Sequence, residues 1–127
     1  MKTIEVVAAV IKHEDKIFIT RRSYGEFMDM WEFPGGKIEK GELREEALVR
    51  EIYEELELSI NIDKYLTTVD YDYPSFHLKM HCFLSKIVGG QLKLNAHNDA
   101  KWIGLDELDK LNWIPADVLV IDAIKNM

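Results

Sequence analysis

The sequence predicts an α/β fold in a single domain, with a mixed β-sheet and helices on two of its faces. Two observations predict it. Apolar, β-branched runs outnumber the segments with helical periodicity, and the expected helices come between and after the expected strands. The length of 127 residues, with 47% hydrophobic and 31% charged residues, suits one globular domain over residues 1–127.

The expected strands are apolar or alternating runs that end at turn residues. The first covers 3–12, and the second covers 16–22 after a turn at 13–15. A loop then runs to residue 33, and the sequence Pro-Gly-Gly at 34–36 breaks the chain. The remaining expected strands are 37–39, 59–73, 76–88 and 101–103.

Three helices are expected. The strongest covers 43–56, because apolar residues recur there at helical spacing. These residues are Leu48, Val49, Ile52 and Leu56. A short helix is expected over 105–111 and a final one over 116–125, where Pro115 suits the first helical position.

Charge, cysteine content and hydropathy exclude several classes of protein. The net charge of 16 − 23 = −7 argues against a partner such as polymeric nucleic acid, which requires a basic surface. The lone Cys82 cannot form an internal disulfide. The apolar run 6–11 is too short for a secretion signal or a membrane span, so a cytoplasmic protein without a membrane partner is expected, as a monomer or a homodimer.

Most of the negative charge lies in one segment. Residues 42–57 hold seven glutamates and two arginines, which is −5 within sixteen residues. Glu51, Glu54 and Glu55 share one helical face, where like charges destabilise the helix. A hard cation such as Mg²⁺ or Mn²⁺ relieves that repulsion. Spacing alone leaves two interpretations open, a metal site and a solvated acidic helix.

The segment Pro34-Gly35-Gly36-Lys37 lies just before this helix. Glycine lets the backbone approach a ligand closely, and lysine can contact phosphate. A tight turn also explains the two glycines. Beside the acidic helix, however, the segment indicates a site for a metal-bound phosphate ester.

Residues 36–58 read GKIEKGELREEALVREIYEELEL and resemble the Nudix box, G-x(5)-E-x(7)-R-E-U-x-E-E-x-G-U with U aliphatic. The matching residues are Gly36, Glu42, Arg50, Glu51, Ile52, Glu54, Glu55 and Leu58. Glu57 departs from the box, which has a glycine where the helix ends. A glutamate that keeps a left-handed conformation there costs about 1 kcal/mol.

The resemblance covers nearly the whole chain. Residues 31–37 and 113–117 look like the corresponding segments of the MutT branch, and residues 4–9 are similar to the CTP pyrophosphohydrolases of that branch. The resemblance implies a Nudix α/β/α sandwich. The implied enzyme hydrolyses a nucleoside triphosphate, such as CTP, dCTP or an oxidised dNTP, to the monophosphate and pyrophosphate with Mg²⁺ or Mn²⁺ as cofactor.

The resemblance also implies roles for the residues of the box. Glu51, Glu54 and Glu55 match metal ligands, with the Gly35 carbonyl as a further ligand. Arg50 matches the residue that orients these glutamates, because its guanidinium can fix a carboxylate rotamer. Glu42, the loop glutamate of the box, matches a structural or outer-sphere position.

Four further residues match substrate contacts. Arg22 and Lys37 match phosphate contacts, and Tyr73 matches an aromatic residue that packs on the base. Asp117 matches a base-reading position, and when ionised it only accepts hydrogen bonds. Tyr73 is equally interpreted as a strand-end core residue, and Asp117 as an acid placed by the helix dipole.

The general base is open between three acids. Asp99, expected in the loop three residues before Trp102, is the candidate, although it is equally an ordinary loop aspartate. Glu54 and Glu55 are the alternatives. The four histidines are scattered and are read as surface or strand residues. A nucleotide-binding module without activity, and a hydrolase of a nucleoside diphosphate derivative such as ADP-ribose, are the alternative functions.

Overall fold

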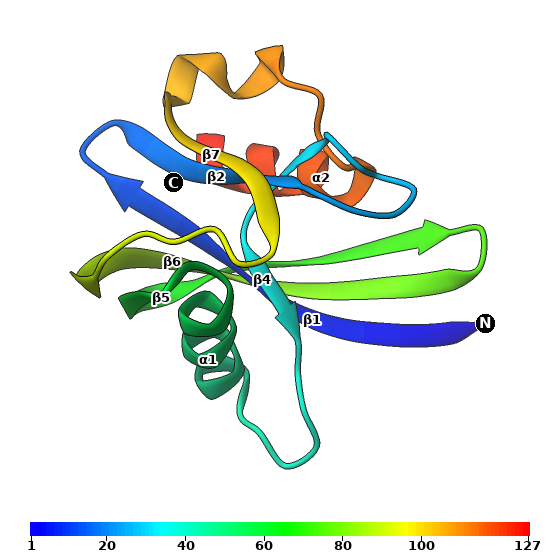
Figure 1. The fold of residues 1–127 in the computed structure, drawn as a ribbon. Coiled ribbons are helices and arrows are strands. Elements are labelled where there is room, and N and C mark those ends of the chain that lie inside the picture. Colours follow the sequence, from blue (N-terminus) through cyan, green and yellow to red (C-terminus); the bar gives the residue numbers. More distant parts are fainter.

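Seven strands form a mixed sheet in the computed structural model, which describes residues 1–127 (Figure 1). The strands are β1 (Lys2–His13), β2 (Lys16–Arg22), β3 (Trp31–Glu32), β4 (Gly35–Lys37), β5 (Leu58–Tyr73), β6 (Phe76–Gly90) and β7 (His97–Gly104). The helices are α1 (Arg44–Leu56), the 3₁₀ helix η1 (Leu105–Lys110) and α2 (Pro115–Lys125). None of these helices combines the length and apolar character needed to cross a membrane.

The centre of the sheet is β1, which pairs with three other strands. It is parallel to β6 and antiparallel to β2 and β4, and β5 completes a long hairpin with β6. The order β3-β2-β1-β6-β5, with β7 joined to β2, makes the sheet mixed as expected. Because successive strand residues project to opposite faces, β1 supplies two separate cores.

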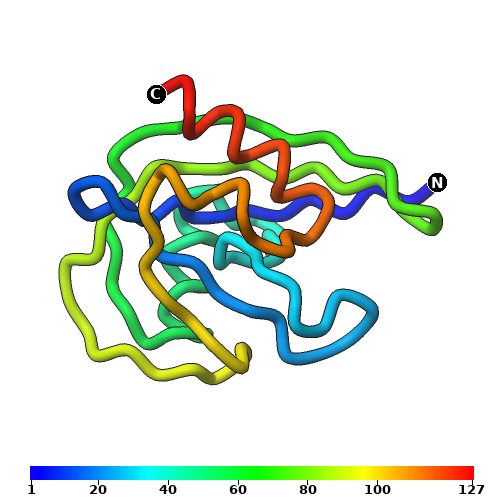
Figure 2. Tube along the Cα trace, turned by 90° about the horizontal axis from the view of Figure 1, so that it is seen from above, coloured from blue at the N-terminus to red at the C-terminus, as the bar shows by residue number.

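Each core lies under one helical layer, which confirms the predicted sandwich. On one face, Val7, Ala9 and Ile11 of β1 join the buried residues of α1. On the other face, Ala8 and Val10 join those of η1 and α2. Figure 2 shows α2 running across the sheet, with the N-terminus and C-terminus at opposite sides of the view.

Several expected elements differ from those observed. Val49 was expected on the apolar face of the first helix, but it is 42% exposed and Ala47 is buried in its place. β4 begins at Gly35, two residues before the expected strand, because pairing with β1 continues through the glycines. β7 begins at His97 rather than at 101, so Asp99 lies in a strand and not in a loop. The short β3 was not expected, since two residues carry no periodicity.

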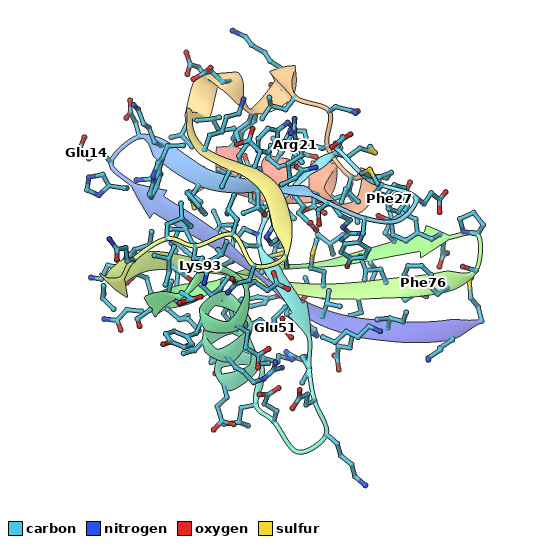
Figure 3. All side chains as sticks on the ribbon, in the orientation of Figure 1. Glu14, Arg21, Phe27, Glu51, Phe76 and Lys93 are labelled. Atoms are coloured by element: carbon cyan, nitrogen blue, oxygen red, sulfur yellow. The ribbon has the colours of Figure 1, made fainter.

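The end of α1 shows how Glu57 replaces a glycine. Glu57 keeps the left-handed conformation, with φ 56° and ψ 31°. Its Oε2 accepts a hydrogen bond of 3.0 Å from Asn95 Nδ2, which also donates to the Glu54 carbonyl at 3.0 Å. The backbone N–H of Lys93 donates to the Leu56 carbonyl at 2.9 Å. The segment after β6 therefore caps the C-terminus of α1, where Lys93 lies in Figure 3.

Candidate active site

Arg50 connects the acidic residues of α1 to the loop before the helix. Its guanidinium binds Glu42 through two nitrogens, at 2.7 and 2.9 Å. Nη1 donates to Glu51 at 2.9 Å and to Glu54 at 3.2 Å, while Nη2 also donates to the Lys37 carbonyl at 3.0 Å. All five N–H groups of the guanidinium are thus used. The Arg50 contact lowers the pKa of Glu42 to about 2.

Both glycines of β4 lie too close to a neighbouring group for a side chain to fit. Gly36 lies opposite Val7 in β1, and a Cβ atom on Gly36 would lie 2.4 Å from the Glu51 carboxylate. A Cβ atom on Gly35 would lie 1.9 Å from the Val7 carbonyl oxygen. Figure 3 shows Glu51 on the side of α1 that faces β4. Glycine is therefore required at both positions for different reasons, one next to backbone and one next to a carboxylate.

A polar pocket collects most of the predicted metal and phosphate residues. The predicted residues that line it are Arg22, Gly35, Lys37, Glu51 and Glu55. Glu54 is not among the lining residues; its side chain is 57% exposed and is tied to the others through Arg50. The structure thus brings together the glycine loop, two of the three predicted glutamate ligands and both predicted phosphate contacts.

Glu32 and His97 also line this pocket, and neither was predicted as a site residue. Glu32 binds Arg22 in a two-point contact of 2.7 and 3.2 Å. His97 Nε2 lies 3.6 Å from Glu32 Oε2 and 3.7 Å from Glu55 Oε2. Burial, together with the charges of Glu51 and Glu32, raises the pKa of Glu55 well above its usual range. Although burial acts against it, His97 and Arg22 hold the pKa of Glu32 below its usual range.

The carboxylates have the chemistry that a divalent cation prefers, but in this structure they are not arranged around a common point. No group of three acidic, histidine or cysteine side chains lies in coordinating geometry. Arg50 holds one oxygen of Glu51 and one of Glu54. Oxygen donors are the ligands that Mg²⁺ and Mn²⁺ prefer, and burial together with the nearby Glu51 and Glu32 carboxylates raises the pKa of Glu55. The residues therefore fit such a cation.

An apolar pocket adjoins the polar one and contains the predicted base contacts. The two pockets share lining residues that include Arg22, Glu32 and Gly36. Tyr73 and Asp117 line the apolar part. The two predicted groups of site residues, for phosphate and for base, thus meet in one continuous depression.

Tyr73 is a wall of the apolar pocket rather than a free platform. It is only 7% exposed, and its hydroxyl accepts a hydrogen bond of 3.1 Å from the Ala116 N–H. Its ring lies 5.3 Å from that of Phe27 and 5.1 Å from that of Phe76. Figure 3 shows Phe27 in the loop after β2 and Phe76 at the start of β6. The structure adds both rings to the predicted aromatic contact.

Asp117 lies in the first turn of α2 and is 5% exposed. Its Oδ2 accepts a hydrogen bond of 2.8 Å from the Phe33 N–H. Burial, with a contribution from Glu32, raises the pKa of Asp117 to about 8. An ionised acceptor was expected, whereas this environment favours the neutral acid at pH 7. A neutral carboxyl both donates and accepts.

Asp99 is the predicted residue that the structure leaves apart. It is absent from the lining of both pockets, and its Oδ1 accepts a hydrogen bond of 2.8 Å from the Ala100 N–H. The missed residues, Glu32 and His97, carried little signal in the sequence. Glu32 precedes the Phe-Pro-Gly-Gly break, which is a weak pointer, and nothing local distinguishes His97 from the other histidines.

Comparison with known proteins agrees with this arrangement. The NUDIX domain family matches residues 1–123, and the chain belongs to this family, in its MutT-like branch. It is 32% identical to the CTP pyrophosphohydrolase of Escherichia coli (strain K12), over 97% of this chain and 92% of the relative. It is also 32% identical to the 8-oxo-dGTP diphosphatase of the same strain, over the full length of both chains.

Solved structures show the same fold. The solution structure of the E. coli ORF135 protein superimposes with a TM-score of 0.88 at 30% identity, covering 99% of this chain and 91% of that one. The MutT NUDIX hydrolase from Burkholderia pseudomallei superimposes with a TM-score of 0.89 at 23% identity, covering 98% of this chain and 99% of that one. The predicted fold and family are thereby confirmed.

Proposed function

We propose that this Nudix enzyme hydrolyses a nucleoside triphosphate to the monophosphate and pyrophosphate, with CTP, dCTP or an oxidised dNTP as substrate. The observation that carries the proposal is the junction of the two pockets. A polar pocket with the box glutamates, Arg22 and Lys37 opens into an apolar pocket with Tyr73 and Asp117. Two joined pockets of this kind suit a ligand with phosphates at one end and a base at the other.

We assign metal binding to Glu51, Glu54 and Glu55, with the Gly35 carbonyl as a further ligand. A bound Mg²⁺ or Mn²⁺ neutralises charge that develops on phosphoryl oxygens and lowers the pKa of a coordinated water. Arg50 keeps Glu51 and Glu54 in fixed rotamers through its bonds of 2.9 and 3.2 Å. Glu42 stays outside this set as the two-point partner of Arg50.

In the proposed reaction, water attacks one phosphorus atom, the bridging P–O bond breaks, and pyrophosphate leaves. We place the general base at Glu55, which lines the polar pocket, rather than at Asp99, which does not. Lys37 and Arg22 hold the phosphate oxygens. The salt bridge to Glu32 uses Nε and Nη2 of Arg22, so Nη1 is the nitrogen that we assign to phosphate.

We assign base recognition to Asp117, with Phe27, Tyr73 and Phe76 around the ring. A neutral Asp117 both donates and accepts, and can therefore read a ring edge that carries both kinds of group. Cytosine and oxidised guanine each present such an edge. The two E. coli relatives named for CTP and for 8-oxo-dGTP support this choice of substrates. We assign the enzyme to the cytoplasm. Nucleotide pools are found there, and its reducing conditions suit the free thiol of Cys82.

The test is a substrate panel with purified protein, Mg²⁺ and separate detection of pyrophosphate and of the nucleoside monophosphate. CTP, dCTP, 8-oxo-dGTP and ADP-ribose form the panel, and Glu54→Gln is expected to lose nearly all turnover. Release of pyrophosphate from none of the triphosphates would overturn the proposal. Tight nucleotide binding without any product would favour a binding module instead, and turnover of ADP-ribose alone would favour a diphosphate substrate.

A further inference from the structure

His97 lies in the polar pocket without a role in the proposal above. Its side chain is 5% exposed, and Nδ1 is the one buried side-chain nitrogen or oxygen without a hydrogen-bond partner. Nε2 lies between two carboxylates, 3.6 Å from Glu32 and 3.7 Å from Glu55. A buried polar atom without a partner is unfavourable, so packing alone does not explain a histidine at this position.

A β-bulge aims the imidazole into the pocket. The register between β2 and β7 shifts so that Arg22 lies opposite His97 and Asn98 is left over. Residues directly opposite one another in antiparallel strands share a face, so the bulge puts His97 on the side of Arg22. Asn98 is held outside by Arg21 Nε and by Asp29 Oδ1, each at 2.7 Å.

The residues before His97 are fixed as firmly as the bulge. Asn95 donates from its backbone N–H to the Glu55 carbonyl and from Nδ2 to the Glu54 carbonyl, both at 3.0 Å. The Ala96 carbonyl accepts a hydrogen bond of 2.9 Å from Ser23 Oγ. The segment that presents His97 is therefore bonded to the helical turn that carries Glu55. Backbone contacts set the distance between imidazole and carboxylate.

The surroundings select a proton on Nε2. An unprotonated Nε2 would direct its lone pair at the Glu32 carboxylate, which is paired with Arg22 and only accepts. When Nε2 carries the proton, Nδ1 is the atom without a partner, and it then has only a lone pair and no N–H to satisfy. Neither Nε2–oxygen distance is yet a hydrogen bond, and a shift of about half an ångström toward one oxygen completes it.

We propose that His97 is a positioning residue of the polar pocket, whose Nε2–H lies between Glu32 and Glu55 and holds the Glu55 carboxylate toward Glu51. This inference rests on the proposed function, in which Glu55 is a metal ligand and the general base. Partners of this kind, which orient a ligand without touching the metal, change metal affinity or activity about 10–100-fold when removed. Its main contribution is a fixed orientation of Glu55.

The first test needs neither substrate nor metal. Long-range ¹H–¹⁵N correlation NMR on histidine-labelled protein reports which ring nitrogen carries the proton, and His97→Leu identifies the signal by its loss. We expect the proton on Nε2. An Nε2 without a proton would overturn the inference, whatever the enzyme hydrolyses.

The second test separates hydrogen bonding from packing. His97→Gln keeps an N–H donor, while His97→Leu fills the space without one, and the exposed His13→Leu is the control. We expect His97→Leu to lower kcat about tenfold or more with little change in KM, and His97→Gln to recover most of that loss. Equal activity of the Gln and Leu variants, at equal thermal midpoints, would refute positioning.

The same variants keep the inference testable if the proposed function fails. Mn²⁺ binding, followed by EPR on the substrate-free protein, should weaken about fivefold or more in His97→Leu and much less in His97→Gln. Equal Mn²⁺ affinity in the wild type and both variants would overturn the positioning role. If His97→Leu does not fold, His97→Gln and His97→Asn replace the pair, since the shorter Asn side chain reaches the place of Nδ1 rather than Nε2.

Discussion

Gly36→Ala is expected to abolish most of the activity while leaving the fold intact. The added Cβ would lie 2.4 Å from Cδ and from one oxygen of Glu51. These atoms are the end of a flexible side chain, so Glu51 moves and the backbone stays. An ordinary contact begins near 3.4 Å, which requires a shift of about 1 Å. That shift breaks the 2.9 Å bond from Arg50 and takes the carboxylate out of the proposed metal position.

The two effects differ in size. Misplacement of a reacting group by about 1 Å costs about 10²-fold in rate, which is about 2.7 kcal/mol in activation free energy. Replacing glycine by alanine also restricts the unfolded chain, which stabilises by about 0.4–1 kcal/mol and offsets the lost Arg50 contact. We therefore expect kcat to fall about 100-fold and the free energy of unfolding to change by less than about 1 kcal/mol.

Pyrophosphate release with Mg²⁺ and chemical denaturation measure the two quantities on the same samples. Gly89→Ala is the matched control, because its Cβ would meet only Ser59 Cβ at 3.9 Å and should change neither. Gly35→Ala is the opposite control, because its Cβ would lie 1.9 Å from the Val7 carbonyl oxygen and should impair folding. Wild-type turnover in Gly36→Ala would refute the reasoning about Glu51.

Three further predictions follow from the contacts of single residues. Arg50→Lys offers three donors from one point in place of five in a plane. We expect kcat to fall about 10–100-fold and the apparent affinity for Mg²⁺, measured by metal titration, to weaken. Wild-type kinetics would contradict this. Burial raises the pKa of Asp117 to about 8, so the folded state holds this proton more tightly than the unfolded chain does. Its contribution to stability is complete below about pH 4 and declines as the pH rises through 8, so denaturation should show Asp117→Asn gaining on the wild type from pH 5 to 9, and a constant difference would count against a neutral acid. Glu57→Gly relieves a φ of 56° and should stabilise by up to about 1 kcal/mol, less the lost bond to Asn95, whereas Glu57→Ala keeps the strain and should be the less stable of the two variants in urea.

The sequence predicts the helices and strands that have a regular pattern of apolar residues. β1, β2, β5 and β6 were expected from apolar runs, and α1 from Leu48, Ile52 and Leu56 at helical spacing. Helical spacing also placed Val49 on the apolar face, but the boundary between buried and exposed faces depends on how α1 packs against the sheet. β3 and the start of β7 are set by pairing with β2, which no local pattern encodes.

The same distinction applies to the site. Gly35, Gly36, Glu51 and Glu55 were predicted to lie together because their spacing in one segment is fixed, and they line one pocket. His97 was missed because its direction depends on a bulge, and a bulge moves every residue before it by one place in the register. Asp117 was predicted as an ionised acceptor, whereas its burial in the folded chain, which the sequence does not reveal, raises its pKa.

The structure also bears on the two interpretations of the acidic helix, a metal site and a solvated face. Repulsion between Glu51 and Glu54 is relieved without metal, because Arg50 donates to both and takes its own counter-charge from Glu42. Glu55 lies beyond the reach of this guanidinium and is the acid whose pKa is raised. The Glu55 side chain is only 23% exposed, which is not typical of an acidic helix that merely faces solvent and supports the proposed metal site. Among the three predicted ligands, Glu55 is the one that lies beside His97 and outside the contacts of Arg50, so its carboxyl oxygens are available to a cation in the proposed site.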